Sequence, residues 1–161
     1  SSHEYLIEQI QDQTISSDNA DLNFNHPVKE LIFTTTTKGD GGTTATPTPL
    51  AETALQLKLN GHDRFAARDF RYFTRTQVWE HHSGAGGLKV DAGAATGRHN
   101  DSIGVYSFAL KPEEHQPSGT CNFSRIDNAQ LIGGSQIDTV FAVNYNVLRI
   151  MSGMGGLAYS N

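Results

Sequence analysis

Apolar and polar residues alternate along much of this chain, with the period of two that is typical of β-strands with one buried face. Residues 55–60 show the alternation most cleanly, because leucine occupies every second position there. Residues 28–33 and 103–110 are rich in β-branched and aromatic side chains and lie close to glycine, asparagine or proline, so we predict that both are strands. Further strands are predicted at residues 5–11, 72–79 and 121–126.

A long strand is predicted near the C-terminus. The odd positions from 141 to 147 hold Phe, Val, Tyr and Val, whereas the even positions between them hold Ala, Asn and Asn. This alternation predicts that the odd-numbered side chains form a packed face. The pattern changes phase at Ile150, which predicts a bulge or bend near Leu148 and Arg149. In all, about eight short strands are expected, the number typical of a two-sheet antiparallel sandwich.

Helical patterning is weak by comparison. We find no window of a dozen residues with apolar positions at i, i+3, i+4 and i+7, so at most short helical turns are expected, around residues 66–70. Two segments, residues 34–49 and 83–102, are predicted to be long loops because the first holds a threonine run with Gly-Asp-Gly-Gly and the second is dominated by glycine and alanine. Loops of this length are uncommon unless they have a function or stay mobile. Disordered surface loops and loops that contact a neighbour both fit them.

Length and composition indicate one all-β domain spanning residues 1–161. The 12 basic and 17 acidic residues give a net charge of -5, so no direct nucleic-acid partner is expected. The chain has no apolar run near the ~20 residues of a membrane-spanning helix and no N-terminal signal pattern, so membrane insertion is not expected either. Because it begins at Ser1 without a methionine, we expect a fragment or processed piece, with any targeting signal upstream.

Seven histidines raise the question of a metal site, since imidazole is a common ligand of zinc, copper and iron. His81 and His82 are adjacent at the predicted end of a strand, where successive side chains point to opposite faces, so only one of them would serve a given site. The same holds for His62 beside Asp63. Cys121 is the single cysteine, which excludes a disulfide within the chain and a cysteine-based zinc cluster. No metal and no cofactor is therefore predicted.

Residues 111–117 gather two carboxylates and an imidazole, from Glu113, Glu114 and His115. Such a set performs general acid–base chemistry when it is withdrawn from water, but the flanking prolines favour an exposed acidic turn. Cys121 lacks a local catalytic signature, and no Gly-x-Ser-x-Gly sequence is present. We therefore predict that the protein is not an enzyme and name no catalytic residue.

Residues 153–158 match the dinucleotide-binding pattern Gly-x-Gly-x-x-Ala. That pattern requires a helix after it and an acidic residue about twenty positions later, and only three residues follow it here. A flexible glycine tail that lies close to a neighbouring backbone is the better interpretation. No cofactor-binding residue is predicted.

Four blocks of sequence carry a resemblance to a known family. They are residues 25–32 (NHPVKELI), 59–65 (LNGHDRF), 106–119 (YSFALKPEEHQPSG) and 144–157 (NYNVLRIMSGMGGL). These blocks are long and specific, and they resemble the major capsid proteins of nucleocytoplasmic large DNA viruses of the iridovirus, phycodnavirus and marseillevirus types. The similarity extends from about Glu4 to Asn161.

The resemblance implies an eight-stranded antiparallel jelly-roll sandwich with long loops. Members of the family have two consecutive jelly rolls, and three copies form a pseudo-hexagonal capsomer that tiles an icosahedral shell. This chain would be the C-terminal jelly roll of a longer parent chain, and the missing first jelly roll puts in doubt whether the piece trimerises alone. The implied partners are other copies of the parent protein, neighbouring capsomers and minor capsid proteins. The implied location is the capsid of a virion assembled in the host cytoplasm.

Shell assembly requires complementary surfaces rather than reactive groups. Five charged residues are candidates for loop ordering or subunit contacts, with an ion pair inside the domain or a solvated charge as the alternative for each: Glu113, Glu114, Arg125, Asp127 and Arg149. His115 is a candidate pH-sensitive contact because it follows two carboxylates.

Two other functions fit a jelly roll, because fold alone does not determine function. A carbohydrate-binding module would need exposed aromatic platforms, and alternation does not decide which face Trp79 takes. A cupin-like metalloenzyme would need a stoichiometric metal ion.

Overall fold

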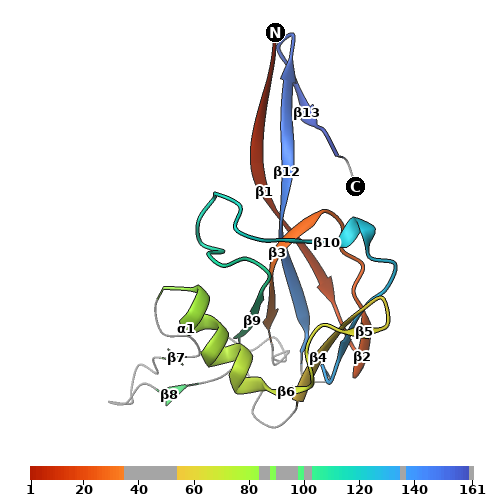
Figure 1. The fold of residues 1–161 in the computed structure, drawn as a ribbon, viewed down its shortest axis with the longest axis vertical. Coiled ribbons are helices and arrows are strands. Elements are labelled where there is room, and N and C mark those ends of the chain that lie inside the picture. The colour runs from red at the N-terminus through yellow and green to blue at the C-terminus, as the bar shows by residue number, and fades with distance from the viewer. Residues whose placement is uncertain (35–53, 84–87, 90–97, 100–102, 135–136, 160–161) are drawn as a thin grey trace, which may run out of the picture.

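The computed structural model of the chain describes residues 1–34, 54–83, 88–89, 98–99, 103–134 and 137–159. Within them, two antiparallel sheets pack against each other, and the helical elements η1 (Tyr72–Thr76) and α1 (Gln77–His81) lie beside the first sheet (Figure 1). Most of the loops predicted at 34–49 and 83–102 lies outside the described residues. The strands are β1 (Ser2–Thr14), β2 (Asn19–Asp21), β3 (Pro27–Thr34), β4 (Ala54–Leu59), β5 (His62–Asp63), β6 (Arg68–Asp69), β7 (Leu88–Lys89), β8 (Arg98–His99), β9 (Ile103–Ser107), β10 (Cys121–Asn122), β11 (Ala129–Ile132), β12 (Thr139–Met151) and β13 (Met154–Leu157).

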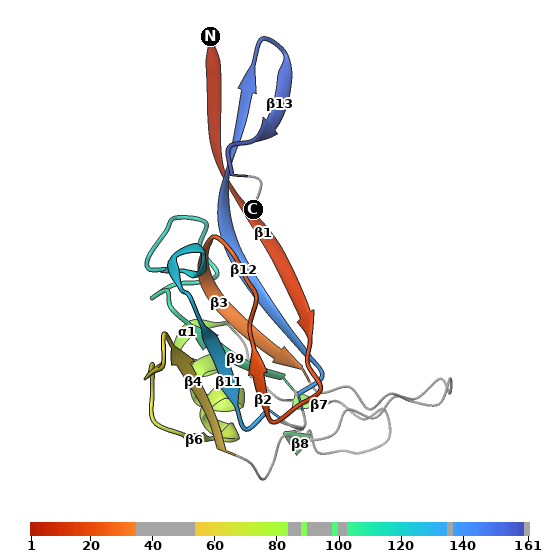
Figure 2. The same ribbon diagram turned by 90° about the vertical axis from the view of Figure 1, so that its right-hand side faces the viewer.

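The strand order is that of a jelly roll. The first sheet runs β1-β12-β3, with β9 and β10 on the far edge of β3 and β13 on β12, and the second runs β2-β11-β4-β5 with β6 also on β4. When β1, β2, β3, β4, β5, β9, β11 and β12 are numbered 1 to 8, the two sheets read 1-8-3-6 and 2-7-4-5. Each sheet therefore interleaves early and late strands, as two nested Greek keys do. Figure 2 shows the two sheets face to face. The predicted all-β jelly roll is confirmed.

The core lies between the two sheets and is built from the alternating positions that the sequence indicates. Burial of apolar surface is the dominant favourable contribution to folding, at about 25 cal/mol per Å². The side chains at the centre are at most 1% exposed and come from β3, β4 and β11: Val28, Leu31, Phe33, Leu55, Leu57 and Leu131.

β1 reaches the core with glutamines rather than apolar residues. The Gln11 side chain donates to the carbonyl of Asn25 at 2.6 Å and accepts from its backbone N–H at 3.0 Å. Gln13 does the same with the segment before β3, donating to the carbonyl of Asp21 at 2.6 Å and accepting from the N–H of Asn23 at 2.8 Å. Each glutamine side chain therefore makes the pair of hydrogen bonds that the backbone of a neighbouring strand would make. The polar inner face of β1 is satisfied in this way.

The segment 72–79, predicted to be a strand, is helical, and that prediction is wrong. A single π-helical turn, η1, leads directly into α1. Its buried side chains are spaced as on one face of a helix: Phe73, Thr74, Gln77 and Val78. The Gln77 amide donates to the Tyr72 hydroxyl at 2.9 Å and accepts from the N–H of Ser107 at 3.1 Å, so its burial is compensated. No helix in the described part of the chain is long and apolar enough to cross a membrane.

The long C-terminal strand is present as β12, but its packed face is the opposite of the predicted one. The side chains that face the second sheet, all 0% exposed, are those of Val140, Ala142 and Asn144. Phe141 and Val143 lie half-buried on the outer face instead. The buried Asn144 amide donates to the carbonyl of Tyr145 at 3.1 Å and accepts from Gln11 at 3.1 Å, so hydrogen bonds allow a polar residue on the core side.

β12 changes neighbours along its length. Its register against β3 shifts between Val143 and Asn144, and there the two strands separate. At Leu148 and Arg149, where a bulge or bend was predicted, β12 pairs without interruption with both β1 and β13, so there is no bulge at these two residues. The glycine-rich tail is not flexible coil but strand β13, which turns back through Ser152–Gly153 with φ values of 53° and 77°. Positive φ at both positions is typical of the type I′ hairpin turn.

The remaining predicted strands are confirmed as β1, β3, β4 and β9, with ends shifted by a few residues. Residues 121–126 form only the two-residue β10, followed by the 3-10 turn η2 (Phe123–Arg125), in which the Asn122 side chain accepts from the N–H of Ser124. The short strands β2 and β11 were not predicted.

Candidate functional site

A loop of residues 108–120, between β9 and β10, crosses the outer face of the first sheet (Figure 1). It is closed on itself by Ser118, whose hydroxyl accepts from the N–H of Lys111 at 2.9 Å. Where the loop closes, a Cβ on Gly119 would lie 2.5 Å from the carbonyl oxygen of Phe108, so only glycine allows this approach. The loop therefore has a defined shape that can present side chains to a neighbour.

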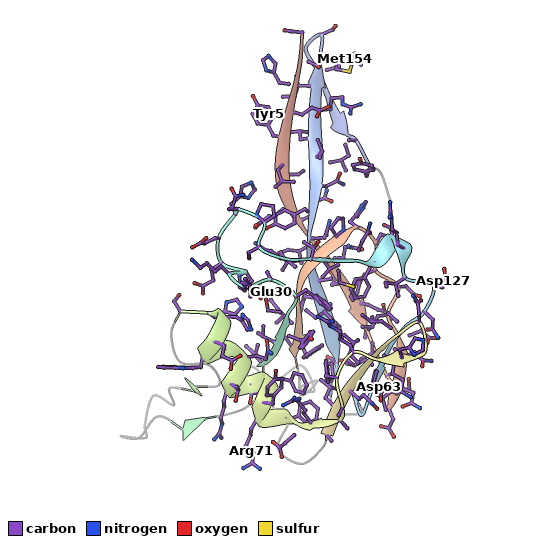
Figure 3. The ribbon with its side chains drawn as sticks, in the orientation of Figure 1. Tyr5, Glu30, Asp63, Arg71, Asp127 and Met154 are labelled. Carbon is purple, nitrogen blue, oxygen red and sulfur yellow. The ribbon has the colours of Figure 1, made fainter. Side chains whose placement is uncertain are left out.

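His82, directly after α1, ties the 108–120 loop to β3. Its Nε2 lies 2.6 Å from Oε2 of Glu30, and its Nδ1 lies 3.2 Å from Oε1 of Glu113. The Glu30 carboxylate is only 7% exposed and lies where sheet, helix and loop meet (Figure 3). The imidazolium form donates from both nitrogens and satisfies both carboxylates. One histidine thus joins three segments that are distant in sequence.

Glu113 is an exposed carboxylate that is held in place by hydrogen bonds. Hydrogen bonds from the backbone and hydroxyl of Ser83, together with His82, hold the pKa of Glu113 below its ordinary value. A group whose pKa is lower in the folded protein stabilises it above the unfolded pKa and ceases to do so as the pH falls through the folded pKa. The anchor of the 108–120 loop should therefore weaken in acid.

We expect Glu113→Gln to lower the urea midpoint of unfolding at pH 7, because the change removes the charge that faces His82. The difference from the unaltered chain should shrink as the pH falls below about 4.3, the ordinary pKa of a glutamate, and on through the lowered pKa of Glu113. Glu114→Gln is the matched control, since the Glu114 carboxylate is exposed and its cation, Lys111, lies 3.8 Å away. A Glu113→Gln difference that stays constant from pH 7 to pH 3 would contradict the role of the charge.

A buried lysine fixes the other side of the 108–120 loop. Lys29 is 3% exposed, and its Nζ pairs with Glu8 and donates to the carbonyl of Glu114 at 3.4 Å. The Tyr145 hydroxyl donates to the carbonyl of His115 at 3.1 Å, and the His115 Nδ1 lies 3.6 Å from the Glu8 carboxylate. His115 therefore faces Glu8 of β1 rather than the two carboxylates before it. Its role as a pH-sensitive contact stays a prediction. If His115→Gln left particle stability unchanged between acidic and neutral pH, that prediction would be contradicted.

The five charged candidates do not form one site. Glu113 and Glu114 belong to the 108–120 loop, whereas Arg149 pairs with Glu4 at 2.9 Å across β12 and β1. Arg125 ends η2, and Asp127 lies beyond it, at a distance from Glu30 (Figure 3). The structure thus places a partner beside three of the five candidates and disperses all of them over the surface.

The histidine and cysteine candidates also lie apart. His81 and His82 end a helix rather than a strand, and the His81 Nδ1 faces the carbonyl of Leu110 at 3.4 Å. His62 is exposed in β5. Burial raises the pKa of the half-buried Cys121 thiol, which keeps it protonated and unreactive. In the described part of the chain, no three His, Cys, Asp or Glu side chains are grouped so that they could hold a metal ion.

The second exposed feature is an arm of residues 2–7, 145–151 and 154–157. Here β1, β12 and β13 continue beyond the sandwich as a three-stranded sheet (Figures 1 and 2). It carries an unusual number of exposed apolar side chains, and sequence alternation alone did not reveal them. Those at least 39% exposed are Tyr5, Leu6, Met151, Met154 and Leu157.

Comparisons with known proteins agree on one family. A family model described as large eukaryotic DNA virus major capsid protein matches residues 1–136. The chain is 51% identical to a major capsid protein of Pyramimonas orientalis virus, over 99% of this chain and 44% of that protein. It is 36% identical to the major capsid protein of Paramecium bursaria Chlorella virus 1, over 99% of this chain and 49% of that protein.

Among solved structures, a chain of a quasi-atomic model of the PBCV-1 virus capsid superposes with a TM-score of 0.73 and 34% identity, covering 100% of this chain and 52% of that one. The chain therefore spans about half the length of these relatives.

Proposed function

The chain belongs to the major capsid protein family of large eukaryotic DNA viruses, and from this we propose that it is one jelly roll, the second of two, in a longer capsid polypeptide. Three copies of that polypeptide form a pseudo-hexagonal capsomer, and capsomers tile an icosahedral shell. The observation that carries the proposal is the match of the whole chain to 52% of a chain in the PBCV-1 virus capsid. The role is structural, in the capsid of the virion.

The features of the described residues support a building block rather than a catalyst. The titratable clusters around His82 and Lys29 join the 108–120 loop to the sheet, and their polar atoms pair with one another. Five of the exposed apolar side chains lie on the arm, where another protein surface can cover them. We propose that the partners are other copies of the parent chain, and also minor capsid proteins, with assembly in the host cytoplasm.

A carbohydrate-binding jelly roll is not favoured. Trp79 is indeed exposed, at 84%, on the outer side of α1. An exposed aromatic ring does not by itself identify a sugar-binding site, whereas the family match is to capsid proteins. A glycan array without binding would discard the carbohydrate-binding alternative.

The solution mass of the parent protein tests the proposal. We expect light scattering on the full open reading frame to give three times the mass of one chain, because a closed three-fold oligomer is what the capsomer requires. Such particles should then be imaged for shells. A strict monomer at every protein and salt concentration would contradict autonomous capsomer formation.

A further inference from the structure

The two faces of the arm differ in chemistry. Antiparallel partners share a face, and the registers Tyr5↔Leu148 and Leu148↔Leu157 place these three side chains in one row across β1, β12 and β13. His3, Ile150 and Gly155 form the next row on the same face. This face, called the Tyr5 face below, holds no Asp, Glu, Lys or Arg.

The opposite face of the arm is interrupted by charge. The ion pair between Glu4 and Arg149 lies between Leu6 and the two methionines of the hairpin, Met151 and Met154. Met154 is 77% exposed and belongs to the same strand as Leu157. The ion pair keeps this face compatible with water, whereas the centre of the Tyr5 face is Leu148, with His3 in the row nearer the tip.

The Tyr5 face is only partly covered within the described residues: Leu148 and Ile150 are of intermediate exposure, and the side chains on the strands beside them are exposed. Tyr5 is 52% and Leu157 44% exposed. A Cβ placed on Gly155 would meet nothing within 4 Å, so the backbone of β13 is open to close approach from outside. Soluble proteins rarely leave such rows of apolar side chains in water unless another surface packs on them.

We infer that the Tyr5 face is the docking surface for the preceding jelly roll of the same polypeptide, an inference that rests on the proposed function. The relatives are about twice as long as this chain, and in the proposed parent the preceding half would join at Ser1, at the free end of the arm where Figure 1 marks the N-terminus, four residues before Tyr5. A tethered neighbour is present at an effective concentration of about millimolar, so its apolar surface reaches this face before that of any second copy. Docking removes the face from water and holds the two jelly rolls in one orientation, as a rigid capsomer needs.

Two aspartate substitutions on the same strand test the inference in the full parent chain. Leu157→Asp places a charge on the Tyr5 face, and Met154→Asp, the control, places it on the opposite face at a more exposed position. We expect Leu157→Asp to lower the thermal unfolding midpoint of the parent by about 5 °C, because docking would bury an unpaired carboxylate, and Met154→Asp to leave it within about 1 °C.

Hydrogen exchange gives a second readout that does not depend on a substitution. In the parent, the amides of β13 should exchange at least about tenfold more slowly than in the 161-residue chain, because the docked jelly roll suppresses opening of the hairpin.

Equal midpoints for both variants and the unaltered parent, or equal losses for both variants, would overturn the inference. A 161-residue chain that is a dimer in solution and becomes a monomer with Leu157→Asp would also overturn it, since the occupant would be a second copy. The proposed function can fail on its own. If the parent were monomeric but Leu157→Asp still destabilised it, the docking surface would stand and the capsomer would not. If the parent were trimeric and Leu157→Asp left its thermal unfolding midpoint unchanged, the capsomer would stand and this docking surface would not.

Discussion

Replacing Phe73 by alanine is expected to lower the free energy of unfolding of this chain by about 3–5 kcal/mol, the range for a large aromatic side chain lost from a packed core. Phe73 is 0% exposed although it lies on a helix at the edge of the sandwich. Its ring contacts those of Phe65 and Phe33, with centroids 5.3 and 6.0 Å away, and that of Tyr106 at 6.5 Å. Phe73 therefore joins the helical segment to both sides of the core.

The neighbouring Gly104 has no side chain that could fill the cavity that the substitution leaves. It packs closely on this site, since a Cβ on it would lie 3.3 Å from the Phe73 Cβ and 3.2 Å from the Phe33 ring. A domain of this size is stable by only about 5–15 kcal/mol, so the loss is a large fraction of the total. Urea unfolding followed by circular dichroism measures it.

Trp79→Ala is the matched control for Phe73→Ala, since Trp79 is on the same helical segment and has a larger ring that is 84% exposed. It should change the free energy of unfolding by no more than about 0.5 kcal/mol. Equal effects of the two substitutions would show that the helical segment is not part of the cooperative core.

The helical segment shows why local pattern fails where the core accepts polar side chains. Its buried face holds Thr74 and Gln77, and the Gln77 amide is satisfied by Tyr72 and by the N–H of Ser107, which is 30 residues away in sequence. Because Thr74 and Gln77 are polar, the buried face of the helix does not show as an apolar pattern in the sequence. The alternation over residues 72–79 favours a strand instead. The strands β3 and β4 could be predicted because their core positions are apolar throughout.

The faces of β12 were misassigned for the related reason that the apolar side is not the core side. Asn144 faces the core because Gln11 of β1 supplies its hydrogen bond, whereas Phe141 and Val143 lie on the outer sheet face. A period of two indicates two faces but does not say which of them a second layer covers. The same limit hid the arm, whose apolar rows become visible only when the pairing of three strands is known.

The site residues divide in the same way. Sequence alone singled out the 113–115 cluster and described it as an acidic turn, which the exposure of Glu113 and Glu114 bears out. The partner of Glu113 could not be predicted, because His82 lies 31 residues before it and had been assigned to a strand. The turns, in contrast, had a readable signal that was missed: Asn60–Gly61 joins β4 to β5, with φ values of 53° and 77°.

Gly133→Ala is expected to cost about 2–4 kcal/mol of unfolding free energy, which no sequence pattern indicates. Gly133 follows β11 with φ of 90°, a backbone conformation that strains any L side chain. A Cβ there would lie 2.0 Å from the carbonyl oxygen of Ala54, the first residue of β4. The N–H of Gly133 donates to the carbonyl of Asp18 at 2.8 Å, so the backbone cannot retreat without losing that hydrogen bond. Relief requires that β4 and β11 separate at the centre of the second sheet.

Gly61→Ala separates the conformational part of this loss from the steric part. Gly61 has a positive φ of 77°, but a Cβ on it meets nothing within 4 Å, so only backbone strain of about 1 kcal/mol is expected. The difference between the losses of unfolding free energy in the two variants, obtained from urea unfolding, therefore measures the clash with Ala54. If Gly133→Ala lost no more than Gly61→Ala, the close packing of β11 on the start of β4 would be contradicted. A larger loss at Gly133 means that the second sheet depends on a contact only glycine permits, and the same variant should then reduce the yield of assembled particles from the parent chain.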